Sequence, residues 1–344
     1  MHGVERAVDP APTRALCSQS AHESNVGGLA PWQVSGRDLR EGLGESAQRP
    51  TSTRKAHFGR STSLHRGRGG VLHASAMEPY ISREQWESLP RRSPMLVQRI
   101  LEHLADAEVK GTFFILGWLA EREPDVVRAI ADGGHEVASH GWDHRRVTAL
   151  SPGEFRDDVR RSRALLQELS GQGVTGYRAP SFSILPGFEW ALDVLLEEGY
   201  EYDSSMVPVR VHPGYGYPRA NPDPHPLRRP AGTLQELPPA TLRVGPMNLP
   251  AGGGAYLRFF PVTLLRRALK AAEARGVPGT IYLHPWELDR EMPPFQAPWA
   301  TRLRMRGGIR TVPRKLSALT SAFRFRTMEE TVRSMEGTMG EGQC

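Results

Sequence analysis

The sequence predicts an α/β fold in which parallel strands form a barrel or a doubly wound sheet. Two observations lead to this class. Strand and helix signals alternate from about Ser75 onward and are joined by short turns, which is the pattern of repeated β-α units. Polar clusters follow three of the predicted strands, and such folds gather their functional groups at the carboxyl ends of the strands.

The predicted strands are short apolar runs bounded by turn residues, and the predicted helices are segments with apolar residues at helical spacing. The strands are 112–116, 135–139, 174–178, 201–203, 280–284 and 323–327. The helices are 95–104, a short one that ends near Gly133, a long one from Pro152, 187–199, 262–275 and one near Lys315. Ser151 and Pro152 supply an N-cap and a first-turn proline for the long helix. The segments 208–230 and 291–308 are predicted to be irregular.

The length and composition fit a globular protein. The 344 residues suffice for two average domains, or for one α/β barrel of about 250 residues with additions. The longest apolar run, residues 111–120, is shorter than the roughly 20 residues that cross a bilayer. Residues 1–30 contain no signal-peptide core. We therefore expect a cytoplasmic protein without an integral membrane segment.

The formal net charge of +6 is concentrated near the N-terminus. Residues 1–72 hold ten Lys or Arg against six Asp or Glu, and beyond them the signs are interspersed. No basic stripe with interleaved aromatic residues occurs, so we do not expect a nucleic-acid partner. The two cysteines, Cys17 and Cys344, cannot build a disulfide framework or a cysteine zinc site. Histidines and carboxylates would have to hold any metal.

Three segments make up the predicted domain organisation. Residues 1–72 contain no Ile and no sustained apolar periodicity, so they are predicted to be disordered, because they cannot bury enough surface to offset the entropy of ordering. Residues 73–290 form the predicted main domain. Residues 291–344 form a predicted C-terminal extension that packs on the barrel.

The first polar cluster is His140-Gly141-Trp142-Asp143-His144, directly after the strand 135–139. Two imidazoles four residues apart, on a helical turn or in a tight loop, can both reach one ion about 2 Å from each nitrogen. An isolated pair of this kind is more often two surface histidines. The position after a strand and beside a carboxylate favours a metal site.

The second cluster contains Arg178, at the end of the strand 174–178. An arginine at a buried rim needs an acidic partner, and its functional use is to orient a catalytic carboxylate. A structural salt bridge to a neighbouring helix is the alternative. Asp203, at the end of the next strand, is a candidate for that carboxylate.

The third cluster is Tyr282-Leu283-His284-Pro285-Trp286-Glu287, which closes the apolar strand 280–284. A histidine can donate a proton at neutral pH and be reprotonated afterwards. His284 is therefore a candidate general acid. The alternative is a core histidine with satisfied hydrogen bonds.

These clusters, in this order and spacing, resemble the polysaccharide deacetylases of the NodB-homology, carbohydrate esterase type, and especially the exosortase-locus subgroup involved in exopolysaccharide production. The resemblance extends from about His73 to Thr327. It rests on the runs Thr-Phe-Phe at 112–114, Ala-Ser-His-Gly-Trp-Asp-His at 138–144, Tyr-Arg-Ala-Pro-Ser-Phe at 177–182, Tyr-Asp-Ser-Ser at 202–205 and Tyr-Leu-His-Pro-Trp at 282–286. It implies an irregular, incomplete (β/α) barrel.

The resemblance also implies roles for individual residues. His140 and His144 match the two histidines that bind a divalent ion, commonly zinc, together with a carboxylate from the first strand. His284 matches the general acid, Arg178 matches the arginine that orients the catalytic carboxylate, and Asp203 matches a further motif of the catalytic site. Sugar contacts are expected from Trp142, Tyr177, Pro180, Phe182 and Trp286, with lid packing as the alternative for the aromatic rings.

The implied reaction removes N-acetyl groups from an acetylated amino-sugar polysaccharide. The ion would lower the pKa of a bound water, an Asp of the first strand would remove a proton from it, and His284 would protonate the leaving amine. Two alternatives stay open. The same barrel could hydrolyse a small cyclic or acyl amide, or the protein could bind glycans without catalysis.

One acidic motif of the family, which lies on its first strand, is missing from this chain, so we expect that strand to be corrupted. Family members carry an acidic run of the form Asp-Val-Glu-Asp-Tyr-Phe just before the stretch that matches residues 73–78, whereas this chain has no Asp between Asp38 and Asp106. The catalytic base and the third metal ligand are therefore absent from their expected place. A site with two histidines alone should bind its ion weakly, so we expect impaired activity.

The genetic code offers an explanation for the missing motif. Residues 65–72, His-Arg-Gly-Arg-Gly-Gly-Val-Leu, can be encoded by bases that, read one position later, give Ile-Val-Asp-Val-Glu-Glu-Tyr and the start of Phe. We hypothesise a one-base frame error before His73, with a truly divergent N-terminus as the alternative. The gene sequence across the Leu72 codon decides between them, since an unshifted frame there refutes the hypothesis.

Overall fold

The computed structural model describes residues 80–210, 215–292 and 296–340. Its α-helices are α1 (Ser93–Asp106), α2 (Gly117–Arg122), α3 (Pro124–Asp132), α4 (Pro152–Ser170), α5 (Trp190–Glu197), α6 (Ala255–Phe259), α7 (Val262–Glu273), α8 (Trp299–Arg306), α9 (Val312–Thr320) and α10 (Met328–Gly340). Its strands are β1 (Thr112–Ile115), β2 (Glu136–Ser139), β3 (Gly176–Tyr177), β4 (Tyr202–Asp203), β5 (His225–Arg229), β6 (Gly232–Glu236), β7 (Thr241–Val244) and β8 (Met247–Pro250).

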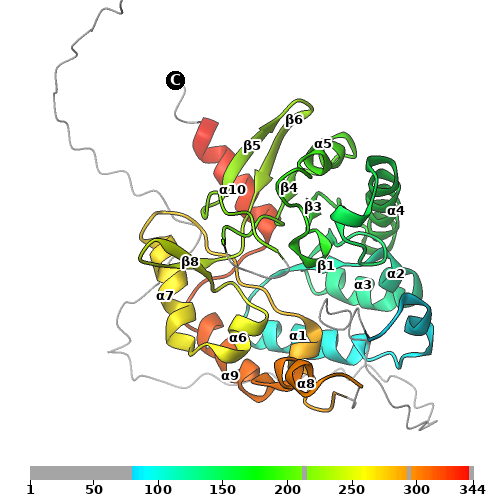
Figure 1. The fold of residues 1–344 in the computed structure, drawn as a ribbon, viewed down its shortest axis with the longest axis vertical. Coiled ribbons are helices and arrows are strands. Elements are labelled where there is room, and N and C mark those ends of the chain that lie inside the picture. The colour runs from blue at the N-terminus through cyan, green and yellow to red at the C-terminus, as the bar shows by residue number, and fades with distance from the viewer. Residues whose placement is uncertain (1–79, 211–214, 293–295, 341–344) are drawn as a thin grey trace, which may run out of the picture.

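A mainly parallel sheet forms the centre of the molecule. Its six strands lie in the order β1-β2-β3-β4-β6-β5. Neighbouring strands from β1 to β6 run parallel, and β5 pairs antiparallel with β6 in a hairpin that projects from the body (Figure 1). The sheet continues irregularly past β6 through two single-residue parallel bridges, Pro239 with Thr280 and Gly253 with Tyr282. The strands thus curve into an incomplete barrel, as predicted.

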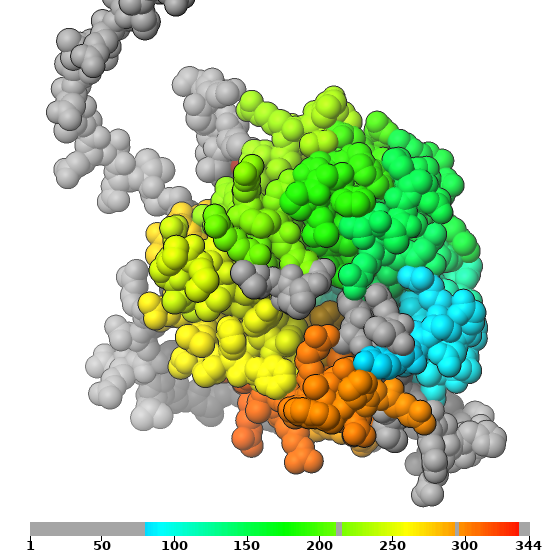
Figure 2. Space-filling model, viewed as in Figure 1, coloured from blue at the N-terminus to red at the C-terminus, as the bar shows by residue number. Residues whose placement is uncertain are grey.

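Helices cover the sheet in two groups (Figure 1). One core lies between the sheet and α3, α4 and α5, and it includes Ile130, Phe155 and Leu195. A second core joins α1, α7 and α9. On the surface α8 lies between the segments that hold α6 and α1 (Figure 2), with the Trp299 side chain exposed. No helix in the described ranges is long and apolar enough to span a membrane.

The predicted start of α4 is confirmed in detail. The Ser151 hydroxyl accepts the backbone N–H of Glu154 at 3.3 Å, and the Glu154 carboxylate accepts the backbone N–H of Ser151 at 2.9 Å. This reciprocal capping box satisfies two helix N–H groups that have no partner within the helix. Gly171, with φ of 67°, ends the helix in the left-handed conformation that glycine adopts easily.

Four predicted segments differ from the structure. The segment 208–230, predicted to be irregular, contains β5, because residues 225–229 pair with β6 across a tight turn. In the described ranges residues 280–284 form no continuous strand; they pair through two single-residue bridges and also line a cavity. Residues 323–327 form no strand, since Phe323 and Phe325 pack against the core beside α9. The stretch 291–308, expected to be irregular, contains α8. Leu303 of this helix is exposed to solvent, so its apolar residues do not all lie on one buried face and give no clear helical periodicity in the sequence. The expected disorder of residues 1–72 concerns residues outside the described ranges.

Candidate active site

The two motif histidines lie in a tight turn directly after β2. The backbone N–H of His140 donates to the carbonyl of Ile115 at 2.9 Å, which fixes the start of the turn to β1. Gly141 and His144 both have positive φ, 76° and 62°. The turn brings the two imidazoles together, with ring centroids 5.3 Å apart and the rings steeply inclined.

A hydrogen bond sets the tautomer of His140. Its Nδ1 lies 2.6 Å from the carbonyl oxygen of Arg178, and a carbonyl can only accept, so the proton sits on Nδ1 and the lone pair on Nε2. Burial lowers the pKa of His140 well below its ordinary value, and the neighbouring His144 acts in the same direction. The ring is therefore neutral at neutral pH, which is the form that ligates metals.

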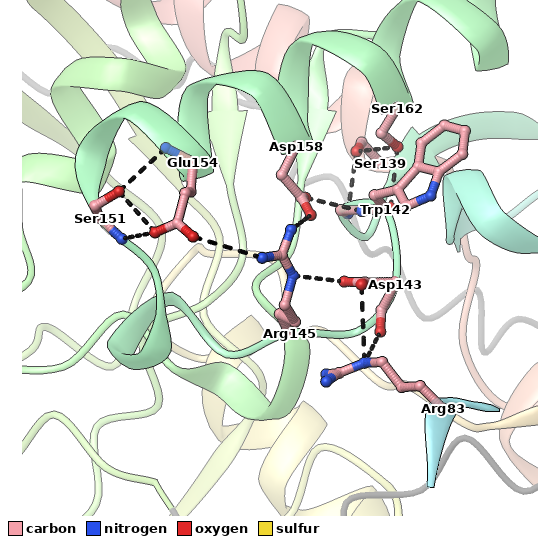
Figure 3. A network of polar contacts seen from close by, with 10 residues as sticks. Arg83, Ser139, Trp142, Asp143, Arg145, Ser151, Glu154, Asp158 and Ser162 are labelled. Atoms are coloured by element: carbon pink, nitrogen blue, oxygen red, sulfur yellow. Dashed lines mark hydrogen bonds and ion pairs between the residues drawn. The ribbon is translucent and has the colours of Figure 1, made fainter. Parts of the chain in front are cut away.

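Polar side chains of α4 hold this turn in place (Figure 3). The backbone N–H of Trp142 donates to Asp158 at 2.8 Å, and the Ser162 hydroxyl donates to the carbonyl of Gly141 at 3.0 Å. Burial raises the pKa of Asp158 to about 6, against the opposing effect of the Trp142 N–H. Arg145 reaches toward Asp158 at 3.9 Å from the solvent side.

Arg178 is a buried cation at the carboxyl end of β3. Its Nε and Nη2 donate to Ser204, to the carbonyl oxygen at 3.1 Å and to the hydroxyl at 2.7 Å. The guanidinium carbon lies 4.2 Å from the ring centroid of Phe114 and 5.6 Å from that of Tyr282. Burial lowers the pKa of Arg178 to about 10. Among the described residues no carboxylate forms an ion pair with it.

Asp203 is not the direct partner that was expected for Arg178. Its carboxylate accepts the hydroxyl of Ser205 at 2.6 Å and the backbone N–H of the same residue at 3.1 Å. Asp203 is fully buried beside Glu236, and burial raises the pKa of both carboxyl groups. The charge of Asp203 raises the pKa of Glu236 further, whereas the hydrogen bond from Glu236 opposes the rise at Asp203. This pair lies behind the strand ends and fixes the turn 204–206.

His284 lies at the mouth of the site, with 45% of its side chain exposed. The Glu287 carboxylate accepts the backbone N–H of His284 at 2.9 Å and lies 3.3 Å from its Nδ1. The buried Arg258 donates to the same carboxylate at 2.8 Å. Burial alone would raise the pKa of Glu287, but the hydrogen bonds and charges of these two neighbours outweigh it and lower the pKa. The ring of Trp286 stacks on His284.

Sequence reasoning gave no role to Glu287 or Arg258. Glu287 stands three residues after His284, the spacing at which an acidic side chain reaches back to a helix N-terminus, and that signal could have identified it. Arg258 comes from α6, and no sequence pattern links it to the site.

One cavity of about 350 Å³ brings most of the predicted site residues together. His140, His144, Arg178 and His284 line it, as do Phe182 and Trp286. Tyr177 and Trp142 do not. The ring of Tyr177 is 1% exposed and packs edge-on against Phe155 and Tyr200, so the expected sugar contact is wrong for this core residue.

Trp142 and Pro180 also differ from their expected position at a sugar. The Trp142 ring packs against Gly117 and lies under the guanidinium of Arg161, whose carbon is 3.3 Å from the ring centroid. Pro180 is buried at the start of a short 3-10 turn (Pro180–Phe182). Neither side chain lines the cavity.

The donor atoms of the described residues do not complete a metal site. Two imidazoles converge, but within the described ranges no group of three His, Cys, Asp or Glu side chains could hold an ion. A protein zinc site has at least three protein ligands. The described residues therefore supply an incomplete set.

Comparisons with known proteins match two successive segments of the chain to different families. Residues 87–193 match the polysaccharide deacetylase family, and residues 204–333 match a domain of unknown function, DUF3473. The peptidoglycan-N-acetylglucosamine deacetylase of Bacillus cereus is 32% identical over 96 residues, which are 28% of this chain and 35% of that protein. The peptidoglycan deacetylase of Helicobacter pylori is 30% identical over 113 residues, 32% of this chain and 37% of that protein.

The chain thus matches about a third of the length of these curated relatives. Among solved structures, a protein described as a candidate polysaccharide deacetylase from Mycobacterium smegmatis superposes with a TM-score of 0.51 at 24% identity. The superposition covers 71% of this chain and 78% of that one. This likeness extends beyond the part matched in sequence and shows a common fold.

Proposed function

Because residues 87–193 carry a polysaccharide deacetylase domain, we propose that the protein is a hydrolase that removes N-acetyl groups from the amino sugars of an exopolysaccharide, with an activity impaired by the missing acidic motif. One observation carries the proposal. The two histidines of one turn, the buried Arg178 and the solvent-accessible His284 line a single cavity although they come from three segments that lie far apart in the sequence.

His284 is the proposed proton donor of the reaction. Cleavage of an amide expels a nitrogen that needs a proton, because an amide anion is a very poor leaving group. Glu287 holds Nδ1 of His284 and so orients Nε2, the other ring nitrogen, from which the imidazolium form can donate. Arg258 fixes Glu287 in turn, so that both act as positioning residues.

Arg178, His140 and His144 line the same cavity as His284. In the proposal the two imidazoles contribute two ligands for a divalent ion, zinc by preference, and Arg178 orients a carboxylate that acts on the attacking water. The described residues place neither a third ligand nor that carboxylate at the cavity, which is the reason for the proposed impairment.

The proposal is tested by acetate release. The full chain, with and without added Zn²⁺, is incubated with an N-acetylated amino-sugar oligomer, and acetate is quantified. We expect slow release that His284→Ala lowers by about 100-fold or more. His225→Ala is the matched control, because the His225 ring on β5 hydrogen-bonds to the nearby Asp223 carbonyl and is not among the residues that line the cavity. Release that is unaffected by His284→Ala contradicts the mechanism, and saturable glycan binding without release supports a glycan-binding protein instead.

A further inference from the structure

Helix α8 exposes two large apolar side chains to solvent. Trp299 and Leu303 are four residues apart and therefore lie on one face of the helix, where they are 72% and 59% exposed. Met305, on the opposite face, is buried. A surface helix normally turns its apolar face to the core and leaves its polar face in water. The exposed tryptophan and leucine of α8 are therefore not explained by packing within the chain.

A third exposed side chain continues this face. Phe259, the last residue of α6, is 51% exposed, and a Cβ on Gly307 would lie 2.7 Å from its ring. Gly307 directly follows α8 and stands eight residues after Trp299, about 12 Å along the helix axis. Figure 2 shows α8 and α6 next to each other on the surface. We call Trp299, Leu303 and Phe259 the apolar ridge.

The chain around the apolar ridge is strongly basic. Residues 296–327 contain eight Lys or Arg and no Asp or Glu, so the even mixing of charges expected beyond residue 72 is wrong for this segment. The acidic residues just before it pair with arginines elsewhere, Glu287 with Arg258 and both Asp289 and Glu291 with Arg92. Six of the cationic side chains are exposed: Arg302, Arg304, Arg306, Arg310, Arg314 and Arg324.

The arginines of α8 lie on both sides of the apolar ridge. At 100° per residue, Arg302 and Arg306 fall on one side of the line from Trp299 to Leu303, and Arg304 falls on the other. Their aliphatic stems can lie along apolar surface while the guanidinium groups reach a polar layer. An apolar centre bordered by cations is the pattern of a helix that lies in a membrane interface, with Trp and Leu among the acyl chains.

Buried contacts hold α8 in this position. Met305 and, just after the helix, Ile309 pack in a small core with Trp286. The buried Arg258 donates to the carbonyl oxygens of Met305 and Gly307, at 3.2 Å and 3.0 Å, and so fixes the C-terminal end of the helix. The apolar ridge is therefore preformed, and docking would cost little entropy of ordering.

We propose that α8 and Phe259 form a docking surface for a membrane that contains anionic lipids. The apolar ridge would enter the boundary between headgroups and acyl chains, and the exposed arginines would contact the anionic headgroups. Charge complementarity favours anionic over zwitterionic lipid. The aliphatic Leu303 at the centre of the ridge fits acyl chains, whereas single-stranded nucleic acid stacks its bases on aromatic rings in a basic groove. The proposal stands independently of the proposed function.

Flotation of the full chain with lipid vesicles tests this docking. Vesicles of phosphatidylcholine mixed with phosphatidylglycerol should carry the protein up a density gradient, whereas phosphatidylcholine alone should carry little of it. The double variant Trp299→Ser, Leu303→Ser should lower the partition coefficient by about 10-fold or more, because it removes most of the inserted apolar surface. The double variant Arg302→Gln, Arg304→Gln should lower it by about 10-fold or more as well, because it removes two cations from the headgroup layer.

A matched control replaces the same residue types outside the docking surface. Arg243 and Met247, in the hairpin of β7 and β8, are both exposed, so Arg243→Gln, Met247→Ser should leave flotation unchanged. All these side chains are exposed, and urea unfolding should show that each variant is as stable as the wild type. Flotation that the α8 variants leave unchanged, or that the hairpin control lowers equally, overturns the proposal.

Tryptophan fluorescence shows whether the apolar ridge itself enters the bilayer. Brominated acyl chains quench an indole only at close range, so they should quench part of the wild-type fluorescence. Trp299→Phe keeps an apolar ring, so it should float nearly as well but lose most of the quenching. Quenching that persists in Trp299→Phe overturns the assigned orientation. Saturable binding of a single-stranded oligonucleotide without any vesicle binding overturns the proposal and assigns the arginines to nucleic acid instead.

Discussion

The buried carboxyl group of Asp158 should make the stability of the fold depend on pH in an unusual direction. Its side chain is 5% exposed, and burial raises its pKa from 3.8 to about 6. The folded chain therefore holds this proton more tightly than the unfolded chain does. The contribution to stability is fully present below pH 3.8 and is lost as the pH rises through the folded pKa.

The size of the effect follows from the shift. A difference of roughly two pKa units, at 1.36 kcal/mol per unit, amounts to about 3 kcal/mol between the two ends of the window. Asp158→Asn removes the titration and keeps an oxygen that can accept the N–H of Trp142. The free energy of unfolding of the wild type, minus that of Asp158→Asn, should therefore fall by about 2.4 kcal/mol from pH 4 to pH 7, because about 0.5 kcal/mol of the effect is already lost at pH 4.

Urea unfolding of both proteins at several pH values measures this difference directly, because the titrations of all other groups cancel. Asp157→Asn is the matched control for the replacement of an Asp by Asn on this helix, since Asp157 is the exposed neighbour of Asp158. A difference for Asp158→Asn that stays constant within about 0.5 kcal/mol refutes the reasoning.

Three further substitutions test the packing and the hydrogen bonds around the site, each by urea or thermal unfolding. Ser151→Ala removes the capping box of α4 and should lower the free energy of unfolding by about 1 kcal/mol, while an unchanged value contradicts the role of the cap. Glu287→Gln leaves the buried Arg258 without its ionic partner and should lower the free energy of unfolding by about 3 kcal/mol. A loss below about 1 kcal/mol would show that the ion pair contributes little to stability. Gly117→Ala places a Cβ 2.4 Å from the Trp142 ring and should lower the free energy of unfolding by about 1–3 kcal/mol. An unchanged melting temperature would mean that the ring moves aside at no cost.

Much of the fold could be predicted because local signals agree with the tertiary structure. The apolar run at β1, the turn after β2 and the Ser151-Pro152 start of α4 each have a physical cause within a few residues. The segments that deviate depend on distant partners. Whether Phe323 pairs in a sheet or packs beside α9 is decided by residues far away in the sequence.

The same distinction holds for the candidate site. His140, His144, Arg178 and His284 could be predicted because each follows a strand, and parallel strands end at one edge. The roles of Tyr177 and Trp142 could not, because an aromatic side chain next to a site residue can point to the cavity or to the core. Arg258 could not be predicted either, since only the packing of α6 brings it to Glu287.

The anchoring of the histidine turn by α4 has a thermodynamic consequence. The turn 140–144 has no regular secondary structure, yet its backbone is bonded to Asp158 and Ser162, one helical turn apart on a 19-residue helix. The two imidazoles are therefore preorganised, and little conformational entropy is lost when a ligand binds between them. What limits affinity at this position is the number of donor atoms, and supplying one more should strengthen binding without any rearrangement of the backbone.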